Sequence, residues 1–291
     1  MEIGKVAIIG AGTMGEGLTE AIAAKDIDVF LFEISEDRLN HGIDMIRTNL
    51  DNKIARWGMT ESEKRALLSR VHGHVGLRRT REVDVVIETI PENLEMKKEL
   101  FGELERTCPP EMIFITNTST LSISKLAEDL YEPTRLVGMH FINPVPVVPL
   151  VEIIRGMKTS EKTFDIACGF AKQLKKRTVE VFEYPGYITT RMIVTMLNEA
   201  MEIVMDGVAS VKDIDTAMRL GYQFEIGPLQ MADAIGLDQV LEWMQTLFRD
   251  LGDLKYRPSS LIRKMVRANK LGVKTGEGFY KYSPEGKLIT K

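Results

Sequence analysis

The stretch from Lys5 to Gly15, KVAIIGAGTMG, predicts the fold of the first part of the chain. After Lys5 it is continuously apolar up to residue 9, which is typical of a strand buried in a parallel sheet. Residues 10–15 (GAGTMG) then match the pattern G-x-G-x-x-G where a strand passes into a helix. The glycines permit a tight turn, close approach of a pyrophosphate to the backbone, and close packing of helix on strand. The helix N-terminus offers N–H groups and a partial positive charge to phosphates.

A carboxylate follows the second predicted strand. Asp28–Phe32 (DVFLF) is apolar enough for a buried strand, and Glu33 comes after it, about 20 residues past the glycines, where dinucleotide-binding folds place an acid. Such a carboxylate accepts hydrogen bonds from both ribose hydroxyls and repels the 2′-phosphate of NADP. The sequence therefore predicts a site for NAD rather than NADP. The residues expected to form it are Gly10, Gly12, Thr13, Met14, Gly15 and Glu33.

Apolar runs alternate with amphipathic helical stretches through the first half of the chain. Further strands are expected at Val83–Ile87, Ile113–Thr116, Leu136–Met139 and Val151–Ile154. Helices are expected at Met14–Ala24, Glu36–Arg56, Asn93–Arg106 and Ser122–Leu130, with a short helix capped by Thr60 and Glu63. This alternation predicts an α/β fold, a Rossmann-type doubly wound parallel sheet with helices on both faces.

After Glu183 the pattern changes to helices alone. Methionines and other apolar residues recur at helical spacing between 192 and 204. Further helices are expected at Val211–Leu220, Leu237–Leu251 and Ser259–Asn269. Proline and glycine interrupt regular structure, so Tyr184-Pro185-Gly186 marks a boundary. We therefore expect an NAD-binding Rossmann-type domain over residues 1–183 and an all-α C-terminal domain over residues 184–291.

The composition argues against several classes of protein. The sequence has 38 Lys+Arg against 42 Asp+Glu, a formal net charge of −4, so a nucleic acid is not expected as the partner. No apolar run is long enough for a membrane span, and the first residues lack the pattern of a secretory signal. Cys108 and Cys168 have no metal-binding spacing and form no disulfide framework. We expect a cytoplasmic protein without a metal, acting on a small molecule.

One histidine and one glutamate form a candidate acid–base pair. His140 follows the strand Leu136–Met139, and Glu152 lies in an apolar run, where a carboxylate must be paired. The proline-rich turn between them could place them side by side, so that Glu152 orients the imidazole and stabilises its cation. The two residues could equally form a structural pair in the core, and the sequence leaves both interpretations open. The other histidines, expected to be exposed, are His41, His72 and His74.

Several motifs together resemble one enzyme family. They run through the whole chain in the family's order: GAGTMGEG (10–17), VIETIPENLEMKKELF (86–101), NTSTLSISKLA (117–127), GMHFINPVPVVPLVEII (138–154), PGYITTR (185–191), GPLQMADAIGLD (227–238) and RPSSLIRKMVRANKLGVKTGEGFYKY (257–282). The chain resembles the L-3-hydroxyacyl-CoA dehydrogenases, in particular the short bacterial 3-hydroxybutyryl-CoA dehydrogenases. The resemblance implies NAD-dependent interconversion of 3-hydroxyacyl and 3-ketoacyl thioesters by a homodimer that dimerises through its helical domain, in fatty-acid β-oxidation or butanoate metabolism.

The resemblance also implies roles for individual residues. His140 would be the general base that takes the hydroxyl proton as hydride leaves C3, and Glu152 would hold its imidazole. Ser119 would hydrogen-bond the substrate oxygen at C3. The residues implied beside the cofactor are Glu92, Lys97, Asn117 and Asn143. Asn143 would also shape the substrate cleft.

Other positions bear on the substrate. Asn49 and Arg56 stand where relatives bind CoA, although the same residues are equally compatible with a solvated helix face. Thr190 replaces the asparagine that contacts substrate in the family's P-G-F-I-x-N-R, and would take over that contact. Glu225 replaces a proline. These departures leave open a dehydrogenase of a non-CoA β-hydroxy acid, like gulonate or carnitine dehydrogenase. A catalytically silent NAD-binding protein, like the crystallins recruited from this family, is a separate alternative.

Overall fold

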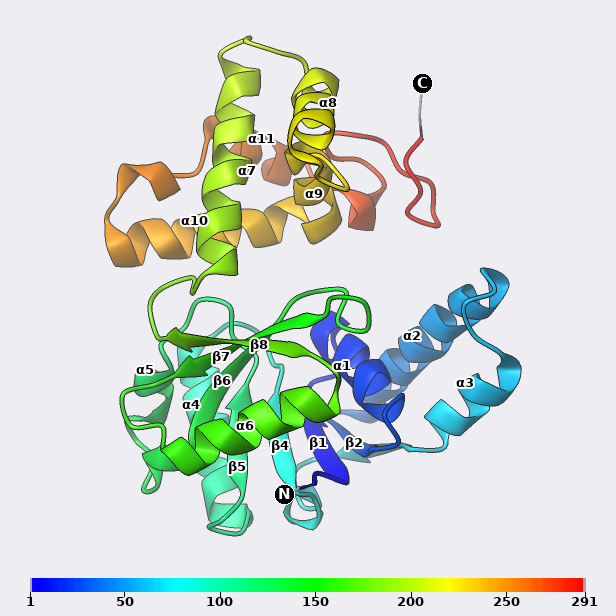
Figure 1. The fold of residues 1–291 in the computed structure, drawn as a ribbon, viewed down its shortest axis with the longest axis vertical. Coiled ribbons are helices and arrows are strands. Elements are labelled where there is room, and N and C mark those ends of the chain that lie inside the picture. Colours follow the sequence, from blue (N-terminus) through cyan, green and yellow to red (C-terminus); the bar gives the residue numbers. More distant parts are fainter. Residues whose placement is uncertain (1, 290–291) are drawn as a thin grey trace. The chain divides into compact units, whose positions relative to one another are not determined.

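The structure, a computed structural model, describes residues 2–289. The chain divides into two compact units, Met1–Glu183 and Tyr184–Lys291. The first unit contains a sheet with helices packed on it, and the second is built from helices (Figure 1). None of the helices in residues 2–289 is long and apolar enough to cross a membrane.

A sheet of eight strands forms the centre of the first unit. Its strands are β1 (Lys5–Ile9), β2 (Asp28–Glu33), β3 (Val71–Val75), β4 (Val85–Glu88), β5 (Ile113–Thr116), β6 (Leu136–Phe141), β7 (Leu150–Arg155) and β8 (Arg177–Phe182). They lie in the order β3-β2-β1-β4-β5-β6-β7-β8. The first six positions repeat the strand order of the Rossmann dinucleotide-binding fold. The predicted fold class is therefore confirmed.

One strand departs from the parallel arrangement of the others. β7 runs antiparallel to β6, with Glu152 directly opposite His140. The other strand pairs are parallel. The connection 142–149 is too short for a parallel crossover, which needs about a dozen residues or more, so the chain must reverse there. This reversal brings the two candidate acid–base residues together.

Apart from α1, the helices of the first unit begin at polar capping residues. They are α1 (Thr13–Ala23), α2 (Glu36–Ala55), α3 (Glu61–Leu68), α4 (Leu94–Thr107), α5 (Ile123–Ala127) and α6 (Glu161–Gln173), with short 3-10 turns at Thr80–Glu82 and Pro133–Arg135. Side chains of Ser35, Asn93, Ser122 and Ser160 each accept a backbone N–H from the first turn that follows. The predicted capping box of α3, formed by Thr60 and Glu63, is present.

Two strands and one helix of this unit are absent from the sequence prediction. β3 and β8 are the two edge strands of the sheet, and most of their residues are exposed or only half-buried. They therefore lack the continuous apolar run by which central strands are found. Helix α6 does carry a signal, because Phe164, Ala167 and Phe170 recur at helical spacing after the cap Ser160. It packs on β6, β7 and β8.

The two faces of the sheet differ in what they bury. Ile87 and Met139 belong to the main core, which also contains residues of α1, α2 and α6. Successive side chains of a strand point to opposite faces. Glu88, His140 and Glu152 alternate with these core positions and therefore share the other face. Three charged or titratable residues are thus gathered on one side of the sheet near its centre.

The second unit consists of helices packed around their own core. They are α7 (Thr189–Met205), α8 (Val211–Tyr222), α9 (Pro228–Ile235), α10 (Leu237–Leu251) and α11 (Ser260–Arg267), with 3-10 turns at Leu254–Tyr256 and Val273–Thr275. Val194, Leu229 and Met244 are fully buried in this core. Among the described residues of this unit only isolated β-bridges occur, which confirms the prediction of a helical domain. Helix α9, which starts with Pro228, was not predicted.

Candidate active site

The carboxyl ends of the parallel strands carry most of the predicted site residues. β1 is followed by the glycine loop, β2 ends at Glu33, and Glu92 lies in the segment that follows β4. β5 is followed by Asn117, and β6 contains His140 next to its last residue. Because parallel strands end at the same edge of a sheet, these residues lie along one edge, where doubly wound folds bind their ligands.

The glycine loop has the geometry that a dinucleotide requires. Gly10 has a φ of +105°, a conformation that favours glycine. A Cβ on Gly15 would lie 1.9 Å from the carbonyl oxygen of Gly10, so only glycine lets α1 pass this close. A Cβ on Gly12 would meet nothing within 4 Å, so the backbone there is open to a ligand. Helix α1 starts without a side-chain cap, which leaves its first N–H groups for a phosphate.

Glu33 is fixed beside the glycine loop. Its Oε1 accepts the backbone N–H of Ala11 (2.9 Å), and its Oε2 lies 3.9 Å from Nε of Arg38. The Glu33 side chain is still 12% exposed. A carboxylate held at the end of β2 and open to solvent fits the role of ribose acceptor that the sequence predicts.

His140 and Glu152 form a direct pair across β6 and β7. Nδ1 of His140 lies 2.6 Å from Oε2 of Glu152. The residues are 5% and 1% exposed, so the contact is shielded from water. A charge-assisted hydrogen bond in such a site holds the imidazole in one orientation. The geometry therefore provides a buried imidazole whose one ring nitrogen is committed to a carboxylate.

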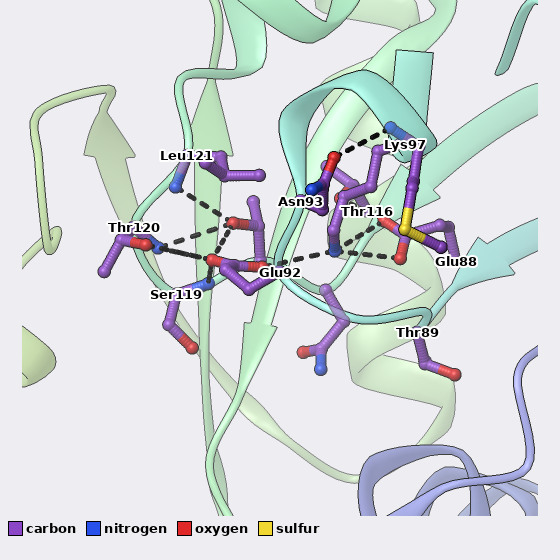
Figure 2. A network of polar contacts seen from close by, with 12 residues as sticks. Glu88, Thr89, Glu92, Asn93, Lys97, Thr116, Ser119, Thr120 and Leu121 are labelled. Carbon is purple, nitrogen blue, oxygen red and sulfur yellow. Dashed lines mark hydrogen bonds and ion pairs between the residues drawn. The ribbon is translucent and has the colours of Figure 1, made fainter. Parts of the chain in front are cut away.

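Asn117 and Ser119 follow β5, the strand that pairs with β6. Oδ1 of Asn117 accepts the backbone N–H of Phe141 (2.9 Å), which ties the end of β5 to the residue after His140. Ser119 lies in the turn that follows. In Figure 2 its hydroxyl points away from the surrounding polar contacts and makes no hydrogen bond to the residues drawn, so it is placed to meet a ligand.

Glu92 organises the turn that carries Ser119 (Figure 2). Its Oε1 accepts the backbone N–H groups of Ser119 (2.9 Å) and Thr120 (3.0 Å), and also the hydroxyls of Thr118 and Thr120. Burial opposes the ionisation of Glu92, but the positive charge of Lys97 and these hydrogen bonds hold the pKa of its carboxyl below the usual range. Glu92 is therefore a charged acceptor around which the turn is folded.

Lys97 and Glu88 form the buried side of the same network. Nζ of Lys97 donates to both carboxylate oxygens of Glu88 (2.8 and 3.0 Å) and lies 3.3 Å from Oε2 of Glu92. The Thr116 hydroxyl donates to Glu88 Oε2 (2.6 Å). Burial raises the pKa of Glu88, against the opposing effect of the Lys97 charge. Burial disfavours the charge on Lys97 as well, but the two carboxylates raise its pKa.

The environment of Lys97 gives no support to the expected contact with the cofactor. Its side chain is 0% exposed, and its ammonium group faces carboxylates of the protein. Glu92, by contrast, is 17% exposed. Among the residues implied beside the cofactor, Lys97 is therefore the one that this structure buries completely, whereas the side chain of Glu92 reaches the surface.

The other residues expected to bear on the substrate lie in several separate parts of the chain. Asn49 on α2 and Arg56 just after it are both exposed. Asn143 is exposed in the connection between β6 and β7. Thr190 is buried in the first turn of α7, in the second unit, and Glu225 is exposed before α9.

One expectation about the remaining histidines is wrong. His41 and His72 are exposed, as predicted, but His74 is half-buried on β3. Its ring stacks on Phe30 with a centroid distance of 5.4 Å, and it lies 5.3 Å from the ring of Phe32. Burial, together with the charge of Arg79, lowers the pKa of His74. Because β3 pairs with β2, the ring of His74 packs against side chains of β2. The hydrophilic sequence around His74 gives no sign of this partial burial.

Sequence reasoning missed three residues at this edge of the sheet. They are Glu88, Thr89 and Thr116. The hydroxyl of Thr89 lies 2.9 Å from the carbonyl oxygen of Gly10 and so supports the glycine loop. Glu88 carries the signal that identified Glu152, a carboxylate within an apolar strand that must find a partner. The two threonines have no distinguishing sequence signal.

Comparison with known proteins agrees with this geometry. Residues 5–184 match the family model of the 3-hydroxyacyl-CoA dehydrogenase NAD-binding domain, and residues 186–282 match that of the 3-hydroxyacyl-CoA dehydrogenase C-terminal domain. The chain belongs to the 3-hydroxyacyl-CoA dehydrogenase family. The first unit of this dehydrogenase is the family's NAD-binding domain, which confirms the predicted cofactor and the predicted class of enzyme, an NAD-dependent 3-hydroxyacyl-CoA dehydrogenase.

Individual relatives match over nearly their full length. A 3-hydroxybutyryl-CoA dehydrogenase of Bradyrhizobium diazoefficiens is 42% identical over 96% of this chain and 96% of its own. Among solved structures, (S)-3-hydroxybutyryl-CoA dehydrogenase PaaH1 from Ralstonia eutropha is 40% identical with a TM-score of 0.88, covering 97% of this chain and 100% of that one. FadB2 of M. tuberculosis is 33% identical with a TM-score of 0.94 over the same shares. Within residues 2–289 of this dehydrogenase, no group of three or more His, Cys, Asp or Glu could hold a metal ion.

Proposed function

We propose that this dehydrogenase interconverts short-chain L-3-hydroxyacyl-CoA, such as 3-hydroxybutyryl-CoA, and the corresponding 3-ketoacyl-CoA, with His140 as the general base. The observation that carries the proposal is the buried His140–Glu152 pair, 2.6 Å apart, on the sheet that holds the NAD loop. In the oxidative direction His140 takes the proton of the C3 hydroxyl, and in the reductive direction it returns that proton. NAD⁺, when bound, accepts the hydride that leaves C3.

Glu152 acts on the imidazole rather than on the substrate. Its carboxylate accepts the Nδ1 proton of His140 and so selects the tautomer whose Nε2 can take a proton. The negative charge then stabilises the imidazolium that forms. The cross-strand register of His140 and Glu152 supports this role, because it keeps the two groups opposite each other without relying on a loop.

Ser119 is the proposed contact of the substrate oxygen at C3. A hydroxyl donor at this position stabilises the negative charge that develops on that oxygen in the reductive direction. Asn117 keeps β5 and β6 together through its bond to Phe141, and Asn143 is proposed to line the site from the connecting loop. The glycine loop and Glu33 are proposed to hold the pyrophosphate and the adenosine ribose.

The CoA thioester is supported chiefly by the names of the relatives. The proteins of Bradyrhizobium diazoefficiens and Ralstonia eutropha are both named 3-hydroxybutyryl-CoA dehydrogenases. We propose that the exposed residues Asn49 and Arg56 contact the CoA moiety, and that Thr190 contacts the acyl part in place of an asparagine. The threonine hydroxyl offers one hydrogen bond but is shorter than the amide that it replaces.

We further propose that the protein is a homodimer formed through its second unit. A groove of about 750 Å³ runs along α7 and is lined mainly by apolar side chains, among them Met192, Met196 and Tyr256. Met192 is exposed although it lies in this groove. Multi-angle light scattering after size-exclusion chromatography tests the proposal, because Met192→Asp should convert a dimer to a monomer. A monomeric wild-type protein would contradict it.

The substrate proposal is tested by a panel of assays that follow NADH absorbance. We expect reduction of acetoacetyl-CoA with NADH, and at least about a hundredfold lower kcat in His140→Gln with unchanged NAD affinity. His72→Gln, at an exposed histidine of the same unit, is the matched control and should retain full activity. Full activity in His140→Gln would refute the mechanism. Turnover of free β-hydroxy acids but not of acyl-CoA would favour the non-CoA alternative, and NAD binding without any turnover would favour the silent protein.

A further inference from the structure

Glu88 is a buried carboxylate that takes no part in the proposed proton transfer. It is the last residue of β4 and is 0% exposed. Burying a charge is costly unless it is paired and hydrogen-bonded. Glu88 meets this requirement, because Lys97 donates to both of its oxygens and Thr116 to one of them. Removing these charges from water costs free energy, and apolar residues of similar volume could fill the same space without that desolvation penalty.

The network leads from Glu88 to the turn that carries Ser119. Lys97 lies between two carboxylates and is closer to Glu88 (2.8 Å) than to Glu92 (3.3 Å). Glu92 in turn accepts the N–H groups of Ser119 and Thr120. Figure 2 shows this chain of contacts, with the Ser119 turn at one end and Glu88 at the other.

We propose that Glu88 is a positioning residue of the dehydrogenase, which acts through Lys97 and Glu92 to hold the Ser119 hydroxyl in place for the substrate oxygen. This inference rests on the proposed role of Ser119. Glu88 draws the Lys97 ammonium away from Glu92, so that Glu92 remains directed toward the turn. Without the charge of Glu88, Lys97 pairs with Glu92 alone and draws its carboxylate away from the backbone N–H groups.

The neighbour of Glu88 extends the same support to the cofactor loop. Thr89 places its hydroxyl against the carbonyl oxygens of Ile9 and Gly10 (3.0 and 2.9 Å). The segment 88–92 thus connects the loop proposed to bind pyrophosphate with the turn proposed to bind substrate. This segment begins at the end of β4. In the sheet, β2 and β3 lie on one side of β1, and β4 is the first strand on the other side.

The test compares Glu88→Gln with a matched control. Gln keeps the size of the side chain and removes its charge. Glu105 is the control, because it is another largely buried carboxylate that accepts two backbone N–H groups, of Tyr131 and Glu132, and pairs with Arg135. We expect Glu88→Gln to lower kcat by about tenfold, since small displacements of a positioning group cost this much or more, while the KM for NADH changes little. Glu105→Gln should keep the wild-type kcat.

A double-mutant cycle separates positioning from general damage. If Glu88 acts through Ser119, Glu88→Gln should cost less than about twofold in kcat in a Ser119→Ala background. The same tenfold loss in that background would overturn the inference, as would an unchanged kcat in Glu88→Gln alone or an equal loss in Glu105→Gln. Should Glu88→Gln fail to fold, Thr116→Val, which removes one hydrogen bond to Glu88, takes its place with a smaller expected loss of the same kind.

A readout independent of turnover distinguishes this inference from the proposed function. The amide protons of Ser119 and Thr120 donate to a carboxylate, so their NMR signals and exchange rates report on Glu92. We expect both signals to shift and to exchange faster in Glu88→Gln but not in Glu105→Gln. Unchanged signals would overturn the inference even in an active enzyme. Shifted signals in a protein without acyl-CoA turnover would leave the network in place and refute only the proposed function.

Discussion

Replacing Glu152 by glutamine tests the proposed acid–base pair most directly. The bond between Nδ1 of His140 and Oε2 of Glu152 is short (2.6 Å) and buried on both sides. A hydrogen bond to a charged group contributes about 1.5–3 kcal/mol and a neutral one about 1 kcal/mol, so the neutral amide forfeits roughly 0.5–2 kcal/mol. At about 1.4 kcal/mol per tenfold, kcat should fall by roughly 2- to 30-fold from the lost charge alone.

The amide adds a second effect. If its NH₂ group turns toward His140, it donates to Nδ1 and selects the tautomer whose Nε2 cannot accept the substrate proton. In a Ser-His-Asp triad, the corresponding change of Asp to Asn lowers kcat by about 10⁴-fold. The expected loss in kcat therefore lies between roughly 2-fold, from the lost charge alone, and about 10⁴-fold, if the wrong tautomer is selected. It should appear in NADH-linked assays of acetoacetyl-CoA reduction, with unchanged NAD affinity by calorimetry.

Glu161→Gln is the matched control for this variant. Glu161 is an exposed carboxylate paired with Arg155, at the other end of β7. It should retain the wild-type kcat. A folded Glu152→Gln enzyme with wild-type kcat and KM would refute the argument that the carboxylate orients and charges the imidazole.

Three further predictions follow from the first unit. Gly15→Ala places a methyl group 1.9 Å from the carbonyl oxygen of Gly10, so it should lower the stability by about 1–3 kcal/mol and weaken NAD binding in calorimetry. The control Gly17→Ala, whose Cβ would lie 3.4 Å from Val145, should melt near the wild-type temperature, and equal melting temperatures of the two variants would contradict the argument. Glu33→Gln removes the charge that repels a 2′-phosphate, so the ratio of kcat/KM for NADH over NADPH should fall; an unchanged ratio would count against Glu33 as the ribose acceptor. The pKa of His74 is lowered in the folded protein, so the unfolded chain binds a proton more readily and stability is lost as the pH falls below about 6.5. The melting temperature of His74→Asn should therefore fall less between pH 7 and pH 5 than that of the wild type, and equal falls would exclude His74 as a source of the pH dependence.

The central strands could be predicted from the sequence because burial on both faces leaves a continuous apolar run. β1, β2, β5 and β6 have this pattern. β3 and β8 do not, because an edge strand meets solvent and its sequence resembles that of a loop. The direction of β7 was also missed, since an apolar run carries no information about the direction in which it pairs. Only the short length of the connection before it could have indicated a reversal.

The candidate site was predictable where a motif or an unusual residue marks it. The glycine loop, Glu33, His140 and Glu152 each break the surrounding pattern in a way that physical chemistry explains. Lys97 shows the opposite case, because its charge suggests a ligand contact while the structure buries it between carboxylates. Long-range pairing of this kind depends on how α4 packs on β4, and no local sequence pattern reports that packing.

The antiparallel pairing of β6 and β7 has a consequence for how this enzyme can diverge. His140 and Glu152 face each other by strand register, and a shift of one residue in either strand would turn one of them to the opposite face of the sheet. Insertions or deletions within these strands should therefore be far more harmful than most substitutions, whereas the connection 142–149, apart from Asn143, can change in sequence. In a library of random variants, length changes should be absent from both strands, from the glycine loop and from the Ser119 turn, and should survive in loops that carry no proposed site residue. The proposed acid–base pair is inherited as an alignment of two strands, and new substrates can evolve around it without rebuilding it.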